Sequence, residues 1–306
     1  MMFEINQITS DVQDLEQLGT KEKFWYSTST GKMLFKFSRA GTGEHWSEKC
    51  AEQLCFKLGI PCATYELAKF EGRPGVITPN LVTDGFNMVM GNEVLHQFES
   101  GSYPKPEGVD EKRVKVREHT VSRVLGCLDA GHIKVMPSSL GLEELSPGDV
   151  FCGYLMLDAL ISNQDRHHEN WAILVNGDTG ERFLCPSYDH AASLGRELTT
   201  ERRIIGLTSK DKNQRVECFV SKARSLLYRL KNDKKPLLTV EAFYCAGEKK
   251  PKAKAFWLER LRGLSDEDFH SIVSKIPDEY MDKHAKAFVL EMLKENKRRL
   301  LNYENA

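Results

Sequence analysis

The loop NQDRHHEN, residues 163–170, decides how this chain folds and where its chemistry lies. It follows the run VFCGYLMLDALIS (150–162), which is apolar nearly all round and therefore predicts a helix buried inside a lobe. Two strand-like segments, 171–175 and 182–186, lead from the loop to Asp189. A hairpin of these strands would return Asp189 to the pocket that holds the loop, so the sequence predicts one polar site built from distant residues.

The side chains of this site match the needs of phosphoryl transfer. One carboxylate must accept or orient the proton of an acceptor hydroxyl, while an Asn and a second carboxylate hold Mg²⁺ against the phosphates of ATP. Asp165 and Asn170 are five residues apart, which is the spacing between those two roles in the protein-kinase catalytic loop. We group His167 with them as candidate catalytic residues, and we take Asn170 and Asp189 as candidate Mg²⁺ ligands.

A purely structural interpretation of the loop competes with this one. Asp, Arg, His and Asn are common in loops, and Asp165 could form a local salt bridge with Arg166. His167, His168 and His190 could suggest a metal site. Mg²⁺ prefers oxygen ligands, however, and adjacent histidines cannot easily turn toward one ion. Because a chance D-R-H-x-x-N pattern is rare at ordinary residue frequencies, the sequence favours the catalytic interpretation.

The composition is that of an ordinary globular protein. The chain has 306 residues, of which 41% are hydrophobic and 28% charged, and its net charge is -1. This length suits two lobes that each bury a core. The balanced charge gives no support for nucleic-acid binding or for an anionic membrane surface, and no apolar run approaches the roughly 20 residues that span a bilayer.

The cysteines and the N-terminus indicate the cellular compartment. The eight cysteines are scattered without a C-x-x-C pair, which makes a structural metal unexpected, and several lie in apolar patterns as reduced core thiols do. The N-terminal sequence has early acidic residues and no apolar signal segment. These features predict a cytoplasmic protein, and they leave open delivery into a host cell by a route without a readable N-terminal signal.

The first part of the chain predicts a small β-rich lobe with one helix. Strand-like runs lie at 23–27, 33–37, 62–70 and 74–79. Residues 44–58 place apolar side chains at helical spacing and stop at Gly59 and Pro61. In Leu34-Phe35-Lys36-Phe37 the two Phe side chains point one way and Lys36 the other, so Lys36 can face a cleft.

The second part predicts a larger helical lobe. Residues 84–108 are rich in Gly, Asn and Pro and are our candidate for the connection between the lobes. Helical patterns follow at 110–128, at 148–162, and from 219 to the amphipathic C-terminal helix at 281–301. We therefore predict a small nucleotide-binding lobe at 1–90 and a mainly helical catalytic lobe at 91–306.

The loop and several other segments resemble the HipA-like serine/threonine kinases, whose fold is related to the protein kinases and phosphoinositide kinases. Similar segments are LGTKEK (18–23), LFK (34–36), EHWSE (44–48), LGIP (58–61), DALISN (158–163) and YDHAASLG (188–195). The similarity covers roughly residues 15–230. It implies an α+β fold with a small β-rich lobe and a larger helical lobe.

The resemblance also implies roles for single residues. Asp165 would be the catalytic base, and Asn170 and Asp189 would bind Mg²⁺. Lys36 would contact the α- and β-phosphates of ATP, and Glu48 could pair with Lys36. The candidate residues of the loop that covers the nucleotide are Gly19, Thr20, Lys21 and Lys23. The candidate contact of the adenine is Val89, in the run Met88-Val89-Met90.

The activity implied is transfer of the γ-phosphoryl group of ATP to Ser or Thr of a protein, with an antitoxin or another regulatory protein as a candidate partner. The family's autophosphorylated serine lies just before the phosphate loop, where this chain has Glu16. Two alternatives remain. One is a lipid or small-molecule kinase, because phosphoinositide kinases share D-R-H-x-x-N. The other is a non-catalytic pseudokinase that binds partners, against which the intact Asp165, Asn170, Asp189 and Lys36 argue.

Overall fold

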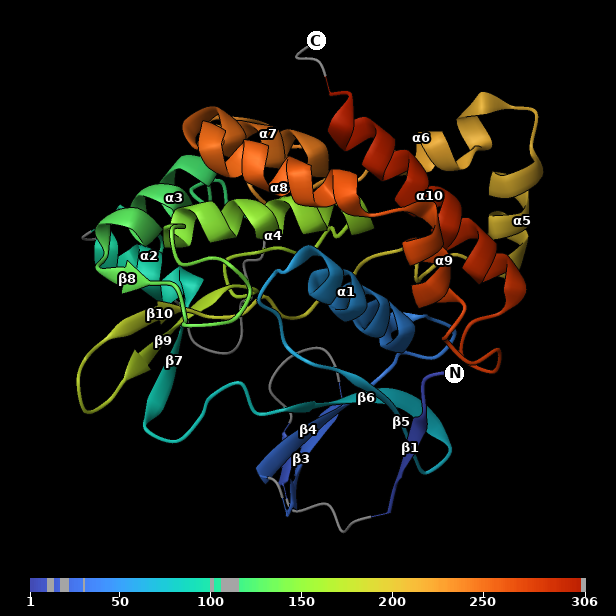
Figure 1. The fold of residues 1–306 in the computed structure, drawn as a ribbon, viewed down its shortest axis with the longest axis horizontal. Helices are drawn as coiled ribbons and strands as arrows, with labels where there is room; N and C mark the ends of the chain where they lie inside the picture. Colours follow the sequence, from blue (N-terminus) through green and yellow to red (C-terminus); the bar gives the residue numbers. More distant parts are fainter. Residues whose placement is uncertain (10–13, 17–21, 30, 100–101, 106–115, 304–306) are drawn as a thin grey trace.

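The computed structural model describes residues 1–9, 14–16, 22–29, 31–99, 102–105 and 116–303. They form a small lobe built on a β-sheet and a larger lobe that is mainly helical (Figure 1). The predicted α+β, two-lobed architecture is therefore confirmed. None of the helices in these ranges combines the length and the apolar character that crossing a membrane requires.

The small lobe contains one twisted sheet with the strand order β1-β5-β6-β4-β3-β2. Its strands are β1 (Ile5–Ile8), β2 (Asp14–Glu16), β3 (Lys23–Thr28), β4 (Gly31–Phe37), β5 (Glu66–Phe70) and β6 (Arg73–Pro79). The β1–β5 pair is parallel and the other pairs are antiparallel. The hairpin β3–β4 and the strands β5 and β6 match the predicted runs, whereas β1 was not predicted.

An aromatic cluster fills one face of this sheet. Phe24, Phe35 and Phe37 are buried there, and the rings of Phe24 and Phe35 stack at 5.0 Å between centroids. Such ring pairs stabilise the sheet beyond the area that they bury. Lys36, between Phe35 and Phe37 in β4, points to the opposite face, as the alternation in the sequence predicts.

Helix α1 (Glu44–Leu58) lies between the two lobes (Figure 1). It contacts β5 and β6 on one side and α4, α8 and α9 of the large lobe on the other. The helix ends at Gly59, whose left-handed φ of 64° suits a residue without a Cβ atom. Because both lobes cover α1, its side chains can link the site residues of one lobe to those of the other.

The large lobe packs its helices around α4 (Pro147–Ile161). The other helices are α2 (Gly91–Phe98), α3 (Val121–Ala130), α5 (Thr200–Thr208), α6 (Val216–Val220), α7 (Thr239–Lys249), α8 (Pro251–Gly263), α9 (Asp266–Val273) and α10 (Lys283–Leu301). Residues 110–115 of the helix predicted at 110–128 lie outside the described residues, and α3 begins at Val121. Helix α2, inside the stretch predicted as a connection, was not predicted.

Helix α4 is buried on every side, as its apolar sequence predicts. It starts with a capping box in which Ser146 and Asp149 satisfy each other's backbone N–H groups. It ends at Ser162, which has a left-handed φ of 52° and turns the chain into the loop 163–170. The loop therefore leaves a rigid, fully packed helix, which fixes the position of the polar side chains that follow.

A second sheet, with the order β7-β9-β10-β8, belongs to the large lobe. Its strands are β7 (Phe86–Met90), β8 (Ile133–Lys134), β9 (Ala172–Asn176) and β10 (Arg182–Leu184). The antiparallel pair β9–β10 is the predicted hairpin between the loop and Asp189. Because β7 pairs with β9, we place the connection between the lobes at 80–85, ahead of the predicted boundary at residue 90.

Candidate active site

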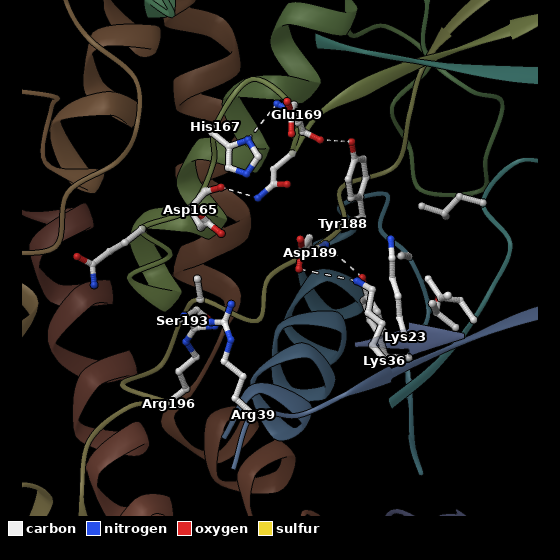
Figure 2. Close-up of a pocket in the computed structure, with 18 of the residues that line it drawn as sticks. Lys23, Lys36, Arg39, Asp165, His167, Glu169, Tyr188, Asp189, Ser193 and Arg196 are labelled. Atoms are coloured by element: carbon white, nitrogen blue, oxygen red, sulfur yellow. Dashed lines mark hydrogen bonds and ion pairs between the residues drawn. The ribbon is translucent and has the colours of Figure 1, made fainter. Parts of the chain in front are cut away.

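A cavity of about 1060 Å³ opens between the two lobes. Lys36 and Tyr65 line it from the small lobe, and Asp165, Asn170 and Asp189 line it from the large lobe. Figure 2 shows Lys36, Asp165 and Asp189 around the cavity. Its size matches the upper end of the range for ligand pockets in proteins. Side chains from four separate parts of the chain therefore share one concave site.

Arg166 fixes the loop 163–170 from inside the protein. Its guanidinium group donates to both oxygens of Asp158, each at 2.8 Å, and to the carbonyl oxygen of Asn170 at 2.8 Å. A fourth bond, at 2.9 Å, reaches Ser187 Oγ, just before Asp189. Arg166 is only 1% exposed. A local Asp165–Arg166 salt bridge, the structural alternative, does not form, because the buried partner of Arg166 is Asp158 on α4.

The loop holds Asp165 and Asn170 side by side. Asn170 Nδ2 donates to the carbonyl oxygen of Asp165 at 2.6 Å, and Asp165 N donates to Asn163 Oδ1 at 3.2 Å. The amide oxygen of Asn170 is therefore the end of that side chain left to face a ligand. The carboxylate of Asp165 is half-buried and lines the cavity, where it can accept a proton.

Asp189 has a left-handed backbone with φ of 57°. Its N–H donates to the hydroxyl of Tyr65 at 3.2 Å, and the next N–H, of His190, donates to Glu48 Oε2 at 2.8 Å. A left-handed Asp persists where its surroundings hold it, and such positions cluster at functional sites. Tyr65 and Glu48 thus aim the Asp189 carboxylate into the cavity.

His190 and Ser187 tie this segment to Arg166. Because Arg166 can only donate, Ser187 Oγ accepts from it, and the Ser187 hydroxyl hydrogen is left to donate to His190 Nε2 at 2.7 Å. Burial, together with the nearby positive charge of Arg166, holds the pKa of His190 well below its usual value. His190 therefore stays neutral with its proton on Nδ1, and it does not act as a metal ligand in this arrangement.

Lys36 lies between two acidic groups. Its Nζ is 3.5 Å from Glu48 Oε1 and 3.8 Å from Asp189 Oδ1. Burial alone would lower the pKa of Lys36, but the oxygens of Tyr65, Asp189 and Glu48 outweigh it and raise that pKa well above its usual value. Lys36 is therefore charged at neutral pH, and the predicted Lys36–Glu48 pair is present in the structure.

Lys23 lies next to Lys36 across the hairpin. The two residues are directly opposite in the β3–β4 register, and both line the cavity. Like charges at opposed positions of a sheet repel each other, so an anion between them would stabilise the pair. This part of the cavity therefore suits a phosphate group.

His167 also lines the cavity, on the side of the loop 163–170 (Figure 2). Its Nδ1 accepts a hydrogen bond from the N–H of Glu169 at 3.1 Å. A neutral imidazole with Nδ1 as acceptor carries its proton on Nε2, so the other ring nitrogen is a donor. Glu169 and Tyr188 line the same side, and the Tyr188 hydroxyl donates to the Glu169 carbonyl oxygen at 2.8 Å.

The structure does not bring every predicted residue into the cavity. Val89 packs against the main hydrophobic core, whereas its neighbours Met88 and Met90 line the cavity. In a strand, neighbouring side chains point to opposite faces, which explains the difference. The predicted phosphate-loop residues Gly19, Thr20 and Lys21 lie outside the described residues, and their role stays a prediction.

Several cavity residues were not predicted. Tyr65 is the anchor of Asp189. Pro79, the last residue of β6, and the linker residues Asn80, Leu81 and Val82 line the cavity at the connection between the lobes. Asn80 Oδ1 accepts from Val82 N at 3.1 Å and shapes that turn. An Asn after a Pro, directly beyond a strand, was a readable turn signal. Nothing in the sequence around Tyr65 distinguishes it from a core aromatic residue.

Asn170 and Asp189 could hold a divalent cation. The free end of Asn170 is an amide oxygen, and Asp189 offers a carboxylate that is 30% exposed on the cavity side. Oxygen donors of this kind are the ligands that Mg²⁺ prefers, and a phosphate beside them would complete its coordination. The donor set therefore fits Mg²⁺.

Comparisons with known proteins find the fold but no family at the level of sequence. No protein-family model matches the chain, and no curated protein does either. The proinflammatory kinase CtkA of Helicobacter pylori is similar with a TM-score of 0.70 at 18% identity, over 94% of this chain and 93% of that one. HipA from the Shewanella oneidensis MR-1 toxin–antitoxin system was solved with HipB and operator DNA. It is similar with a TM-score of 0.55 at 10% identity, over 95% of this chain and 66% of that one.

A Golgi casein kinase is similar at a TM-score of 0.45 and 11% identity, over 96% of this chain and 73% of that one. At these identities a likeness speaks for the fold. The paired lobes, the cavity between them, and the match to CtkA along nearly the full length of both chains agree with one another. The chain has a protein-kinase-like fold of the kind found in CtkA and HipA.

Proposed function

We propose that the protein is an ATP- and Mg²⁺-dependent kinase that phosphorylates Ser or Thr residues of proteins. The observation that carries the proposal is the meeting of Asp165, Asn170, Asp189 and Lys36 in one cavity, from three separate parts of the chain. These are the groups that phosphoryl transfer needs. A pseudokinase usually lacks one of them, and this chain keeps all four.

Each side chain has a distinct task in this mechanism. Lys36, with Lys23 opposite, binds phosphate oxygens of ATP and holds the nucleotide in place. Asp165 accepts the proton of the acceptor hydroxyl and orients its oxygen toward the γ-phosphorus. Mg²⁺, held by Asn170 and Asp189, would neutralise charge that develops on the phosphate oxygens. The bond to the γ-phosphorus forms from the acceptor oxygen, and ADP leaves.

His167 supports the same step. Its Nε2–H is a neutral donor on the cavity side, where it can bind an oxygen of the transferring group without adding a second base beside Asp165. Glu48 positions Lys36 and the segment of Asp189 together, because one of its oxygens contacts Lys36 and the other accepts from His190 N.

The cysteines and one structural neighbour bear on the setting of the reaction. All eight cysteines are free thiols, which fits a reducing compartment such as the cytoplasm. The likeness to HipA, which was solved with its antitoxin, supports a search for a small regulatory protein that binds this chain.

A labelling experiment tests the proposed function. The purified protein is incubated with γ-³²P-ATP and Mg²⁺, alone, with a cell extract, and with phosphoinositide vesicles. We expect label on protein Ser or Thr that disappears in Asp165→Ala. Label on lipid would instead indicate the phosphoinositide-kinase alternative, and no label on any acceptor would favour a pseudokinase.

A further inference from the structure

The cavity extends beyond the proposed catalytic residues to an end that phosphoryl transfer itself does not use. Arg39, Arg196, Leu198 and Phe219 line the cavity, and Figure 2 shows the two arginines together at this end. Arg39 follows β4 in the small lobe, and Arg196 follows Asp189 in the large lobe. A cavity of about 1060 Å³ has room for part of a second substrate beside a nucleotide.

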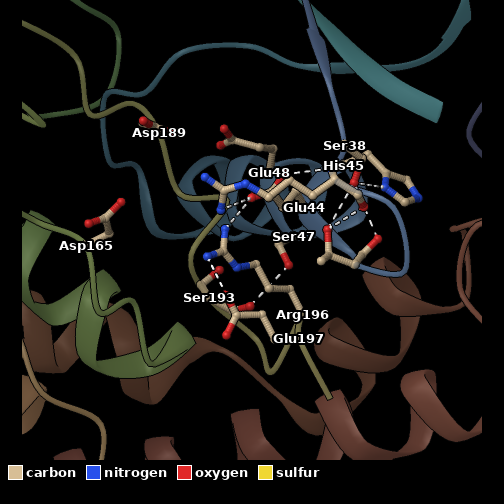
Figure 3. A network of polar contacts seen from close by, with 12 residues as sticks. Ser38, Glu44, His45, Ser47, Glu48, Asp165, Asp189, Ser193, Arg196 and Glu197 are labelled. Atoms are coloured by element: carbon tan, nitrogen blue, oxygen red, sulfur yellow. Dashed lines mark hydrogen bonds and ion pairs between the residues drawn. The ribbon is translucent and has the colours of Figure 1, made fainter. Parts of the chain in front are cut away.

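The two arginines converge on one buried carboxylate, that of Glu44. Figure 3 shows Arg196 beside Glu44. Glu44 Oε1, at the start of α1, lies 2.6 Å from Arg196 Nη1 and 3.4 Å from Arg39 Nη1. The backbone N–H of Arg39 also donates to Glu44 Oε2 at 3.0 Å. The Glu44 side chain is only 4% exposed, so it stands behind the guanidinium groups, which face the cavity.

A second acidic partner of Arg196 is easily displaced. Arg196 Nη2 is 2.9 Å from Glu197 Oε1, but the Glu197 side chain is 68% exposed while that of Arg196 is 13% exposed. An ion pair with so exposed a partner contributes little. A guanidinium group has five N–H donors in a planar fork that fits carboxylate and phosphate groups. An anion entering the cavity can therefore replace Glu197 and bind Arg196 through two parallel bonds.

The side chain of Arg196 is one of several links between α1 and the Asp189 segment. Gly43 N donates to the carbonyl oxygen of Arg196 at 3.0 Å, and Ser47 Oγ donates to that of Ser193 at 3.2 Å. These bonds involve backbone oxygens, so they persist when the guanidinium group is changed. A role in recognition can therefore be separated from a role in holding the segment.

We propose that Arg39 and Arg196 bind an anionic side chain of the protein substrate close to the acceptor hydroxyl. The inference rests on the proposed kinase function and names its substrate class: Ser or Thr flanked by Asp, Glu or a phosphorylated residue. Leu198 and Phe219 border the arginines and offer an apolar contact to a neighbouring residue of the same peptide.

The surface favours a peptide over a lipid. The exposed large apolar side chains of the described residues are Met1, Met2, Phe56, Phe98, Ile204 and Leu230, and none of them lines the cavity. A membrane-docking surface would place such side chains together around the opening. A phosphoinositide headgroup could satisfy the same arginines, so a lipid arm belongs in the test.

Matched peptides test the proposal with the full chain and Mg²⁺-ATP. Each peptide carries one Ser acceptor and, at one of the three positions on either side, Ala, Asp or phosphoserine. We expect Asp or phosphoserine to raise kcat/KM over Ala by about 10- to 100-fold at one or two positions. Comparing the Asp and phosphoserine arms distinguishes a carboxylate from a phosphate ligand.

For each variant we compare kcat/KM for the acidic peptide with kcat/KM for the Ala peptide. A loss of folded enzyme lowers both values equally, so it cancels in this acidic-to-Ala ratio. Arg196→Gln and Arg39→Gln should bring it close to 1, and Arg196→Lys should keep part of it. The control Arg262→Gln removes an exposed arginine on α8, which pairs with Glu259, and should leave the ratio unchanged.

Several outcomes would overturn the proposal. A wild-type ratio near 1 despite strong labelling would reject it while leaving the kinase function standing. An equal fall of kcat/KM for all peptides in Arg196→Gln would also reject the proposal, because the arginine would then act on the fold alone. Label on phosphoinositide vesicles and on no peptide would reject the peptide class. Absence of label on any acceptor would reject the kinase function and this inference together.

Discussion

The guanidinium group of Arg166 forms two parallel hydrogen bonds, both 2.8 Å long, with the carboxylate of Asp158. Asp158 belongs to the last turns of α4, and Arg166 follows the proposed catalytic base directly. Through Asn170 and Ser187, Arg166 also reaches both segments that carry the proposed Mg²⁺ ligands. One buried ion pair thus fixes Asp165, Asn170 and Asp189 relative to the most deeply packed helix.

Breaking this pair should destabilise the protein strongly. Asp158→Asn leaves the Arg166 charge buried without its counter-ion, and we expect the free energy of unfolding to fall by about 3–5 kcal/mol in urea titrations. The exposed pair Arg262–Glu259 supplies the control, because Glu259→Gln should cost less than about 1 kcal/mol. In the double variant Asp158→Asn with Arg166→Met, the free energy of unfolding should fall by less than the sum of the falls in the two single variants. Equal small losses in all of these proteins would mean that the pair does not anchor the loop.

Asp189 should be needed for the metal and not for the fold. Asp189→Asn keeps the backbone N–H that binds Tyr65 but replaces a charged Mg²⁺ ligand by a neutral one. We expect Mg²⁺-dependent transfer to be abolished while the circular dichroism spectrum stays that of the wild type. Unchanged activity in this variant would remove Asp189 from the metal site.

Lys36 and Glu48 should differ in the size of their effects. Lys36→Met removes a positive charge from the phosphate end of the cavity, and we expect kcat to fall by about 100- to 1000-fold. Glu48→Gln keeps an oxygen that can accept from His190 N but loses the charge that faces Lys36, so a smaller fall is expected. Steady-state rates over a range of ATP concentrations measure both effects, and equal losses would show that Glu48 does more than position Lys36.

The sequence was most informative where one segment carries its own signal. Gly59 and Pro61 predicted the end of α1, and the alternation around Lys36 predicted its face of β4. The side of β7 that faces the cavity could not be predicted, because it depends on the pairing with β9, far along the chain. For that reason the sequence predicted Val89 as the cavity residue of β7, whereas Met88 and Met90 line the cavity.

Long-range partners were the other part that the sequence did not reveal. Tyr65, Arg39 and Arg196 carry no local pattern that marks them as cavity residues. Their positions follow from the packing of both lobes on α1, which brings Glu44 and Glu48 to the segment 189–196. Asp165, Asn170 and Asp189 were predicted together because their spacing in the sequence is typical of a kinase site. The fold brings the three residues to one cavity.

The buried His119 should make stability depend on pH. Its Nδ1 faces the Leu226 carbonyl oxygen at 3.2 Å, and its Nε2 accepts from Trp171 at 3.2 Å, so the neutral ring uses both nitrogens. Burial, with a smaller contribution from His168, lowers the pKa of His119 from 6.5 to about 3. The folded pKa lies below the unfolded one, so this contribution is complete above pH 6.5 and is lost as the pH falls toward 3.

Between pH 8 and pH 5, the contribution of His119 to the free energy of unfolding falls by about 2 kcal/mol. Urea titrations of the wild type and of His119→Gln at both values measure it, because the carboxylates that also titrate are common to the two proteins. We expect the variant to be less stable at pH 8 but to lose about 2 kcal/mol less on going to pH 5. Equal losses in the two proteins would mean that His119 does not titrate below its usual range.

The central claim is that Asp165, beside the ligands of a magnesium nucleotide, removes the proton of an acceptor hydroxyl. The most direct test is single-turnover transfer of phosphate from Mg²⁺-ATP to a protein that the labelling experiment identifies as a substrate. The rate is compared between the wild type and Asp165→Asn. We predict that the variant binds Mg²⁺-ATP within a few-fold of the wild type by calorimetry and transfers phosphate at least about 100-fold more slowly. Transfer at the wild-type rate by Asp165→Asn would contradict the account.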